Sequence, residues 1–184
     1  MAHASEEHEK VSEYFDLIDG HVLSPIENTD VRQSCLASLM LLFSAIDGLG
    51  RLLHPQSNAG VGERFKAFLP RLGPGYVGRE EALWDLRNSV MHNGLNTASF
   101  MSHVETGEQH HLEVVPPENL LYVSTSVLLK DFRVTFERLK QEILQDPRRL
   151  VQAASRLCWG AVNSPAWGDH QVTPPPPVLF VRTR

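Results

Sequence analysis

The sequence predicts an all-α fold, a helical bundle that carries one small inserted β-hairpin. Along most of the chain, apolar residues recur at spacings of three and four, which is the period of an amphipathic helix. The 184 residues are 42% hydrophobic, which is enough for one globular domain with its own core. We therefore expect a helical domain over residues 1–158 and a proline-rich C-terminal tail over residues 159–184.

The first two helices are expected over residues 6–23 and 30–54. Ser24-Pro25 is a stop signal for the first helix. The second helix has the most continuous apolar seam, formed by Cys35, Leu39, Leu42, Ile46, Leu49 and Leu53. Gly48 and Gly50 each lower helix propensity by about 1 kcal/mol relative to alanine. In so apolar a helix, two glycines indicate that another backbone approaches closely.

The middle of the chain is expected to hold a short helix over residues 62–72, a helix over residues 78–92 and the β-hairpin. Asn93-Gly94 is a good stop for the second of these helices, because glycine readily takes a positive φ. The hairpin strands are expected over residues 97–104 and 109–115, on either side of a Glu-Thr-Gly-Glu turn.

A long helix over residues 117–145 and a short helix over residues 148–158 complete the predicted bundle. Pro116-Pro117 is interpreted as the opening of the long helix, and Asp146-Pro147 as its end. In the tail, the run Pro174–Pro177 should be extended in the polyproline form.

Composition excludes several classes of protein. The net charge of −5 argues against a protein that grips long nucleic acid by charge alone. The two cysteines, Cys35 and Cys158, give no disulfide framework and no zinc spacing, and Cys35 is expected to be a buried thiol. Residues 1–10 are polar and acidic, unlike a signal peptide, and the longest apolar run, Leu39–Phe43, is far too short to span a membrane. A cytoplasmic protein without membrane association is predicted.

The candidate chemistry lies in Arg87, Asn88 and His92, at the end of an apolar helix. Arginine offers a charged planar fork that matches a phosphate, and histidine exchanges protons near neutral pH. Arg87 and His92 are five residues apart, roughly 140° around an ideal helix, so they converge only if His92 lies at a frayed end or if a second copy faces the first. The alternative is a helix-terminal histidine that interacts with the helix dipole, beside a surface arginine.

Asp47 is the second candidate, because it lies at the margin of the apolar seam of its helix. Its carboxylate is placed to pair with Arg87 or to orient His92. The alternative is an ordinary acid at the edge of the core, paired with Arg51 four residues later.

Two weaker candidates are each expected to be structural. The hairpin histidines His103, His110 and His111 invite a metal site, but no cysteine or patterned carboxylate supports one, so we expect them to be exposed to solvent. Toward the C-terminus, a basic patch for single-stranded RNA competes with a solvated terminal helix and a docking tail. Its members would be Arg148, Arg149, Arg156, Trp159 and Trp167.

Arg87, Asn88 and His92 resemble the signature of the HEPN superfamily, an arginine, a polar residue and a histidine at the end of an apolar helix. The resemblance extends over residues 10–145 and includes the internal acid Asp47, the segment Phe65-Lys-Ala-Phe68 and the segment Leu83-Trp-Asp-Leu-Arg87. It implies a helical bundle that dimerises, so that two motifs meet in a cleft at the interface. Active members resemble metal-independent ribonucleases, in which the 2′-hydroxyl attacks the adjacent phosphate and leaves a cyclic phosphate and a free 5′-hydroxyl.

The resemblance also implies roles for individual residues. His92 would handle proton transfer, Arg87 would stabilise charge on the phosphate, and Asn88 would orient the phosphate or His92. The predicted function is thus a homodimeric HEPN-type endoribonuclease in defence or toxin–antitoxin control, with RNA as substrate, an antitoxin or regulatory protein as a further partner, and neither cofactor nor metal. Two alternatives stay open: an inactive HEPN dimer that serves as an interaction module, and a regulatory protein that binds a nucleotide or another ligand in the same cleft.

Overall fold

In a computed structural model of the chain, residues 2–28, 31–55, 58–93, 99–102, 110–115 and 120–157 are described. Helices make up most of these residues, which confirms the predicted all-α class. The expected tail over residues 159–184 and the second cysteine, Cys158, lie outside the described residues.

The N-terminal helix runs further than predicted. Helix α1 (Ala2–Ile18) widens into the π-helical turn η1 (Asp19–Leu23) and continues as α2 (Ser24–Asn28), so Ser24-Pro25 does not end it. The backbone N–H of Ser24 donates to the carbonyl of Asp19, the five-residue bond of a π-turn. A wider turn just before Pro25 lets the helix pass a residue that has no N–H of its own.

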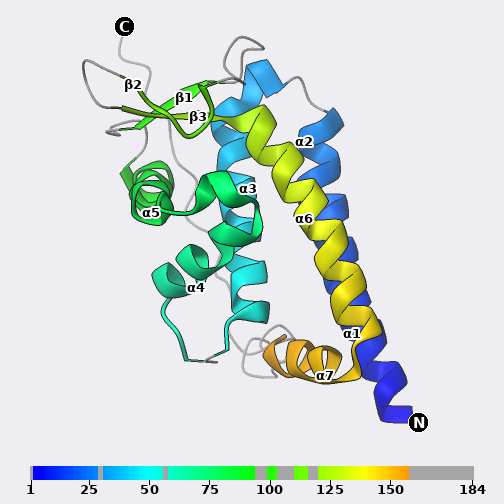
Figure 1. Cartoon of the computed structure of the whole chain (residues 1–184). Helices are drawn as coiled ribbons and strands as arrows, with labels where there is room; N and C mark the ends of the chain where they lie inside the picture. Colours follow the sequence, from blue (N-terminus) through cyan, green and yellow to red (C-terminus); the bar gives the residue numbers. More distant parts are fainter. Residues whose placement is uncertain are drawn as a thin grey trace, which may run out of the picture.

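Helix α3 (Val31–Leu53) is the predicted seam helix and lies in the middle of the domain, between α6 on one side and α4 on the other (Figure 1). A Cβ atom at Gly50 would lie 2.7 Å from the carbonyl oxygen of Arg64, so the expected close backbone approach is confirmed there. At Gly48 the close neighbour is the Tyr14 side chain instead.

The stretch Cys35–Leu53 of α3 is long and apolar enough to span a membrane by length and composition, although no single run of apolar residues in it is long. Half of the stretch is buried inside the domain, and the core helix of a soluble protein has the same composition. This feature is therefore weak support for a membrane span, and the cytoplasmic location stays a prediction.

The next segment folds back along α3 in short helices. Helix α4 (Val61–Phe68) continues as the 3-10 turn η2 (Leu69–Arg71), and a second 3-10 turn, η3 (Pro74–Tyr76), leads to α5 (Glu80–Asn88) and the π-turn η4 (Ser89–Asn93). The two helices predicted for this segment are both present. Gly94, the expected stop, lies outside the described residues.

The predicted β-hairpin is wrong in its pairing. Strand β1 (Ser99–Ser102) pairs in parallel with β3 (Leu120–Ser124), and β2 (Val114–Val115) pairs antiparallel with β3, so the described parts of the two expected hairpin strands are not neighbours. The central strand β3 lies where the sequence pattern predicts a helix. Its alternation buries Leu121 and Val123, which favours a strand with one face on the core.

Helix α6 (Thr125–Gln145) consequently begins later than the predicted start at residue 117. Its N-cap is Ser124, whose hydroxyl accepts from the backbone N–H of Val127, so Pro116-Pro117 does not open the helix. The end at Asp146 is as predicted, and Asp146 caps the N-terminus of α7 (Pro147–Arg156) with its side chain.

The core lies where α3 meets η1, α4, α6 and α7, and where α1 packs against α6 and α7. Helices α1 and α6 lie side by side, and α7 crosses below α3 and α6 near the N-terminus, while the small sheet covers the opposite end (Figure 1). Six phenylalanines are almost completely buried in this core: Phe15, Phe43, Phe65, Phe68, Phe132 and Phe136. The sheet and α5 therefore rest on one end of a helical body, and the candidate site lies where α5 meets α3.

Candidate functional site

The π-turn η4 brings the two ends of the motif together. In an ideal α-helix Arg87 and His92 would lie on different sides, but a π-turn places residues five apart above one another. The Nη1 of Arg87 lies 3.3 Å from the Nε2 of His92. The convergence expected from a frayed end or from a second chain is therefore reached within one chain, by a widened turn.

Asp47 forms an ion pair with Arg87, one of the two pairings that the sequence predicted for this carboxylate. The Asp47 Oδ2 lies 2.5 Å from Nη2 and 3.2 Å from Nε of the guanidinium. Only 17% of the Asp47 side chain and 12% of the Arg87 side chain are exposed. Both N–H groups meet the same oxygen, while the other, Oδ1, is buried without a hydrogen-bond partner among the described residues. The pair is thus largely desolvated and keeps one unused acceptor.

The guanidinium of Arg87 is held on several sides. Besides Asp47 and His92, its Nη1 donates to the Oδ1 of Asn88 at 3.3 Å. The ring of Trp84, one turn earlier on α5, lies 5.2 Å from the guanidinium carbon. Four hydrogen bonds therefore engage this guanidinium inside the chain, out of the five N–H groups that an arginine offers. Arg87 is a preorganised cation with little freedom to turn away.

Burial raises the pKa of the Asp47 carboxyl above its ordinary value. The hydrogen bond and the charge of Arg87, and the more distant charge of Arg64, act in the opposite direction. The raised pKa reflects how little water reaches this carboxyl.

His92 presents a lone pair in this arrangement. A guanidinium only donates hydrogen bonds, so the contact with Arg87 is a hydrogen bond only when the Nε2 of His92 carries no proton. The imidazole itself is exposed to solvent. An exposed base beside a fixed cation and an amide is an arrangement that can accept a proton next to a bound phosphate.

Sequence reasoning missed two members of this cluster. Trp84 was recognised only as part of the segment Leu83-Trp-Asp-Leu-Arg87, although its position three residues before Arg87 places both on one helix face. Arg64, whose charge reaches Asp47, was not considered, and nothing in its local sequence points to α3.

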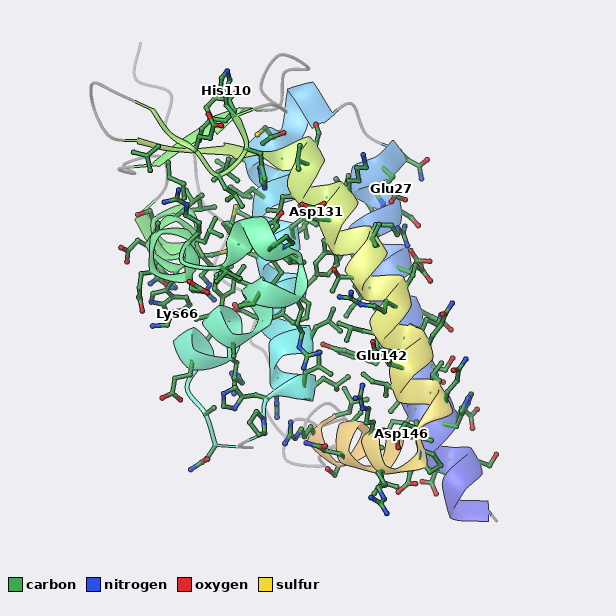
Figure 2. All side chains as sticks on the ribbon, in the orientation of Figure 1. Glu27, Lys66, His110, Asp131, Glu142 and Asp146 are labelled. Atoms are coloured by element: carbon green, nitrogen blue, oxygen red, sulfur yellow. The ribbon has the colours of Figure 1, made fainter. Side chains whose placement is uncertain are left out.

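The expected exposure of the three histidines of the predicted hairpin is wrong for His111. His110 is exposed and pairs with Glu113 at 2.9 Å, whereas His111 is half-buried. His103 lies outside the described residues. Figure 2 shows His110 at the outer side of the sheet, away from the helical body.

His111 belongs to a chain of hydrogen bonds that connects the sheet to α6. The backbone N–H of Ser124 donates to its Nδ1 at 3.1 Å, so the proton of the neutral ring is on Nε2. That Nε2 lies 3.0 Å from the hydroxyl of Tyr76, which donates in turn to the Oδ2 of Asp131 at 2.9 Å. Burial lowers the pKa of His111, and the negative charge of Asp131 offsets part of this fall.

The middle member of this chain, Tyr76, is almost fully buried. Burial and the neighbouring Asp131 carboxylate both raise the pKa of its hydroxyl far above the ordinary value, so Tyr76 stays a neutral donor. Next to His111, Leu112 has a φ of 65°, in the left-handed region that a bulky residue rarely adopts. These contacts hold the turn before β2 in one conformation.

The basic residues of the C-terminal helix are engaged in structure. The guanidinium of Arg156 donates to the carbonyls of Leu52, His54 and Pro55, and so caps the C-terminal end of α3. Arg149 pairs with Glu142 at 2.7 Å. The Arg148 side chain is exposed, and the two tryptophans of the expected patch, Trp159 and Trp167, lie outside the described residues.

Cys35, expected to be a buried thiol, is partly buried, and its Sγ lies 3.1 Å from the Oγ1 of Thr125. In the part of the chain that the structure describes, no group of three or more histidine, cysteine, aspartate or glutamate side chains is arranged to hold a metal ion.

In comparisons with known proteins, no family model, no curated protein and no solved structure matches this chain. The HEPN resemblance accordingly rests on the motif and its place at the end of a helix.

Proposed function

We propose that this protein is a metal-independent endoribonuclease of the HEPN type, with Arg87, Asn88, His92 and Asp47 as its site and RNA as its substrate. The observation that carries the proposal is the contact between the guanidinium of Arg87 and the Nε2 of His92. This contact supports the proposal because it joins a cation that can bind phosphate, Arg87, to a group that can accept a proton, His92. As the resemblance implies, two such sites would face each other in a homodimer.

The proposed reaction uses the groups in the roles that their chemistry suits. The Nε2 of His92 takes the proton of the ribose 2′-hydroxyl, and the 2′-oxygen forms a bond to the adjacent phosphorus. The bond from phosphorus to the 5′-oxygen breaks, and this oxygen takes a proton from water. The products are a 2′,3′-cyclic phosphate and a 5′-hydroxyl. Arg87 stabilises the charge that develops on the phosphate, and Asn88 and Asp47 keep the guanidinium in place.

The burial of Arg87 favours a second candidate function. Only 12% of this side chain is exposed, and most of its donors already have partners inside the chain. An arginine whose donors are mostly bonded within its own chain also suits a catalytically inactive HEPN dimer. Such a dimer would act as an interaction module or as a nucleotide-binding regulatory module. RNA cleavage requires at least one of these internal hydrogen bonds to be exchanged for a phosphate oxygen.

The deciding experiment is incubation of the full chain with a mixed-sequence RNA in EDTA, followed by analysis of the product ends. We expect cleavage with cyclic phosphate ends, and a fall in rate of about 100-fold or more for His92→Ala, the loss typical of a general base. A matched RNA with a single 2′-deoxyribose at the cleaved position should resist, because it lacks the attacking hydroxyl.

His110→Ala is the matched control, since it removes another exposed histidine from outside the site. It should cleave like the wild type. If the wild type does not cleave, or if His92→Ala keeps full activity, the ribonuclease proposal is wrong and the inactive module takes its place.

A further inference from the structure

A hollow that the residues of the candidate site do not line lies between the C-terminal half of α3 and the end of α4. It has a volume of about 60 Å³ and is lined by Gly50, Leu53, His54, Arg64, Phe68 and Arg71, among others. Among the described residues, no acidic side chain lines it. The absence of a side chain at Gly50 lets the backbones of α3 and α4 come together at this point.

The two arginines of this hollow differ from several other arginines of the chain. Arg87, Arg133 and Arg149 pair with carboxylates, and Arg156 caps α3. Neither arginine of the hollow has a carboxylate within ion-pair distance in the described ranges, although the chain as a whole carries a charge of −5. The hollow therefore gathers two arginines that have no ion-pair partner among the described residues, on an acidic protein, although the charge of Arg64 also acts on Asp47 from further away.

Arg64 in particular has donors to spare. Its Nη1 donates to the carbonyl of Ala59 at 2.9 Å, and its Nε is buried without a hydrogen-bond partner among the described residues. Because this Nε is closed to solvent, a ligand in the hollow would meet the Nη1 and Nη2 donors, of which one has a described partner, the carbonyl of Ala59. Arg71 lies seven residues later, about two helical turns along, and both arginines line the same hollow.

A larger hollow adjoins the first and shares Leu53 and Arg71 with it. Its volume is about 160 Å³, and its wall includes Leu52, Ile143, Gln152 and Ala153. Arg149 at its edge is paired with Glu142, and Figure 2 shows Glu142 on the lower part of α6 and Asp146 at the junction of α6 and α7. The larger hollow thus combines aliphatic side chains with Arg71, Arg149 and the amide of Gln152, and its exposed lining is more polar than apolar. Arg71 lines both hollows.

We infer that these adjoining hollows form a binding site for a small phosphomonoester, whose phosphate is held between Arg64 and Arg71 and whose organic part lies in the larger hollow. Two guanidinium groups match the charge of a phosphate dianion and offer it several N–H donors. The combined volume is below that of usual drug-sized pockets, which restricts the organic part to about the size of one small sugar. The inference does not depend on RNA cleavage.

The test is calorimetric titration of the full chain at low ionic strength with inorganic phosphate, with ribose 5-phosphate and with acetate. We expect saturable binding of one phosphate per chain, tighter binding of ribose 5-phosphate, and no binding of the singly charged acetate. Arg71→Gln should weaken phosphate binding about tenfold or more, since a charged hydrogen bond is lost. Because the Arg71 side chain is exposed and makes no described contact to a carboxylate, this variant should fold normally.

Arg79→Gln is the matched control, an arginine that also lacks a carboxylate partner among the described residues but does not line either hollow. It should bind phosphate like the wild type. The absence of saturable binding, or an equal loss in the control, would overturn the site. An affinity for ribose 5-phosphate no higher than for inorganic phosphate would overturn the assignment to a phosphomonoester. No RNA enters these assays, so their outcome is separate from that of the cleavage experiment.

Discussion

The molecule contains two histidine-centred clusters that are built in opposite ways. His92 is exposed and has one described hydrogen bond, which it accepts from the guanidinium of Arg87. This guanidinium can also bind another group, such as a phosphate. His111 is half-buried, and both of its ring nitrogens have partners in the chain. The first imidazole is accessible and presents an acceptor, whereas the second is fixed in one tautomer between a backbone N–H and a tyrosine.

The difference shows how placement decides what a histidine can do. A ring whose nitrogens are both satisfied inside the fold connects elements, and it has no group left for a substrate. Here it joins β3, the turn before β2, η3 and α6. The ring of His92, at the end of a π-turn, is held among the described residues by its hydrogen bond with the neighbouring arginine. We therefore expect changes near His111 to act on stability, and changes at His92 to act on activity.

Tyr76→Phe should have the largest effect on stability, a loss of about 2 to 3 kcal/mol in the free energy of unfolding. The substitution keeps the ring but removes the hydroxyl, which leaves the Nε2–H of His111 and the Oδ2 of Asp131 without their partner. The loss is measured as the difference in free energy of unfolding between the wild type and Tyr76→Phe, by urea unfolding at pH 8.

Tyr14→Phe is the matched control for this loss. Tyr14 is also partly buried in the core, but its hydroxyl makes no hydrogen bond to a described residue. Its removal should change the free energy of unfolding by much less. Equal losses in the two variants would show that the chain from Ser124 to Asp131 does not stabilise the fold.

Asp47→Asn should have a smaller effect, a loss of about 1 to 2 kcal/mol. Asparagine keeps the shape and one acceptor oxygen, but it leaves the charge of Arg87 largely buried without a counter-charge. Asp85→Asn on the exposed face of α5 is the control and should change little. If chemical denaturation finds no difference between the two variants, the pair behaves as a surface pair, and Asp47 is not needed to hold Arg87.

The helices were predictable because their patterns are local. The seam of α3 and the close approach at Gly50 can be inferred from spacing and propensity within one segment. The sheet was not predictable in this way, because β3 runs directly into α6 and the apolar residues of the two elements form one continuous pattern. Ser124 is the local signal that was missed, since a serine is a better N-cap than a pair of prolines.

The candidate site was predictable in its members but not in its geometry. Arg87, His92 and Asp47 carry recognisable chemistry, and one of the two pairings proposed for Asp47 is confirmed. The contact between Arg87 and His92 depends on a π-turn, and ideal helix geometry predicts the opposite. The hydrogen-bond partners of His111 are 13 and 35 residues away along the chain, so no local pattern connects them.

The smallest effect we expect is a dependence of stability on pH that comes from His111. Burial lowers its pKa from 6.5 in the folded state, so below pH 6.5 the unfolded chain binds more protons at this residue than the folded one. The stability contributed by the neutral ring is fully present above pH 6.5 and is lost as the pH falls from 6.5 through the folded pKa. One proton limits the slope to about 1.4 kcal/mol per pH unit.

The difference in unfolding free energy between the wild type and His111→Asn, measured from pH 8 to pH 5, isolates this contribution. It should shrink as the pH falls, because asparagine keeps an acceptor for the N–H of Ser124 but does not titrate. A constant difference over this range would contradict a neutral His111 in the folded protein. Asp131→Asn sharpens the test: because the Asp131 charge raises the pKa of His111, its removal should lower that pKa further, as measured by NMR titration of the ring.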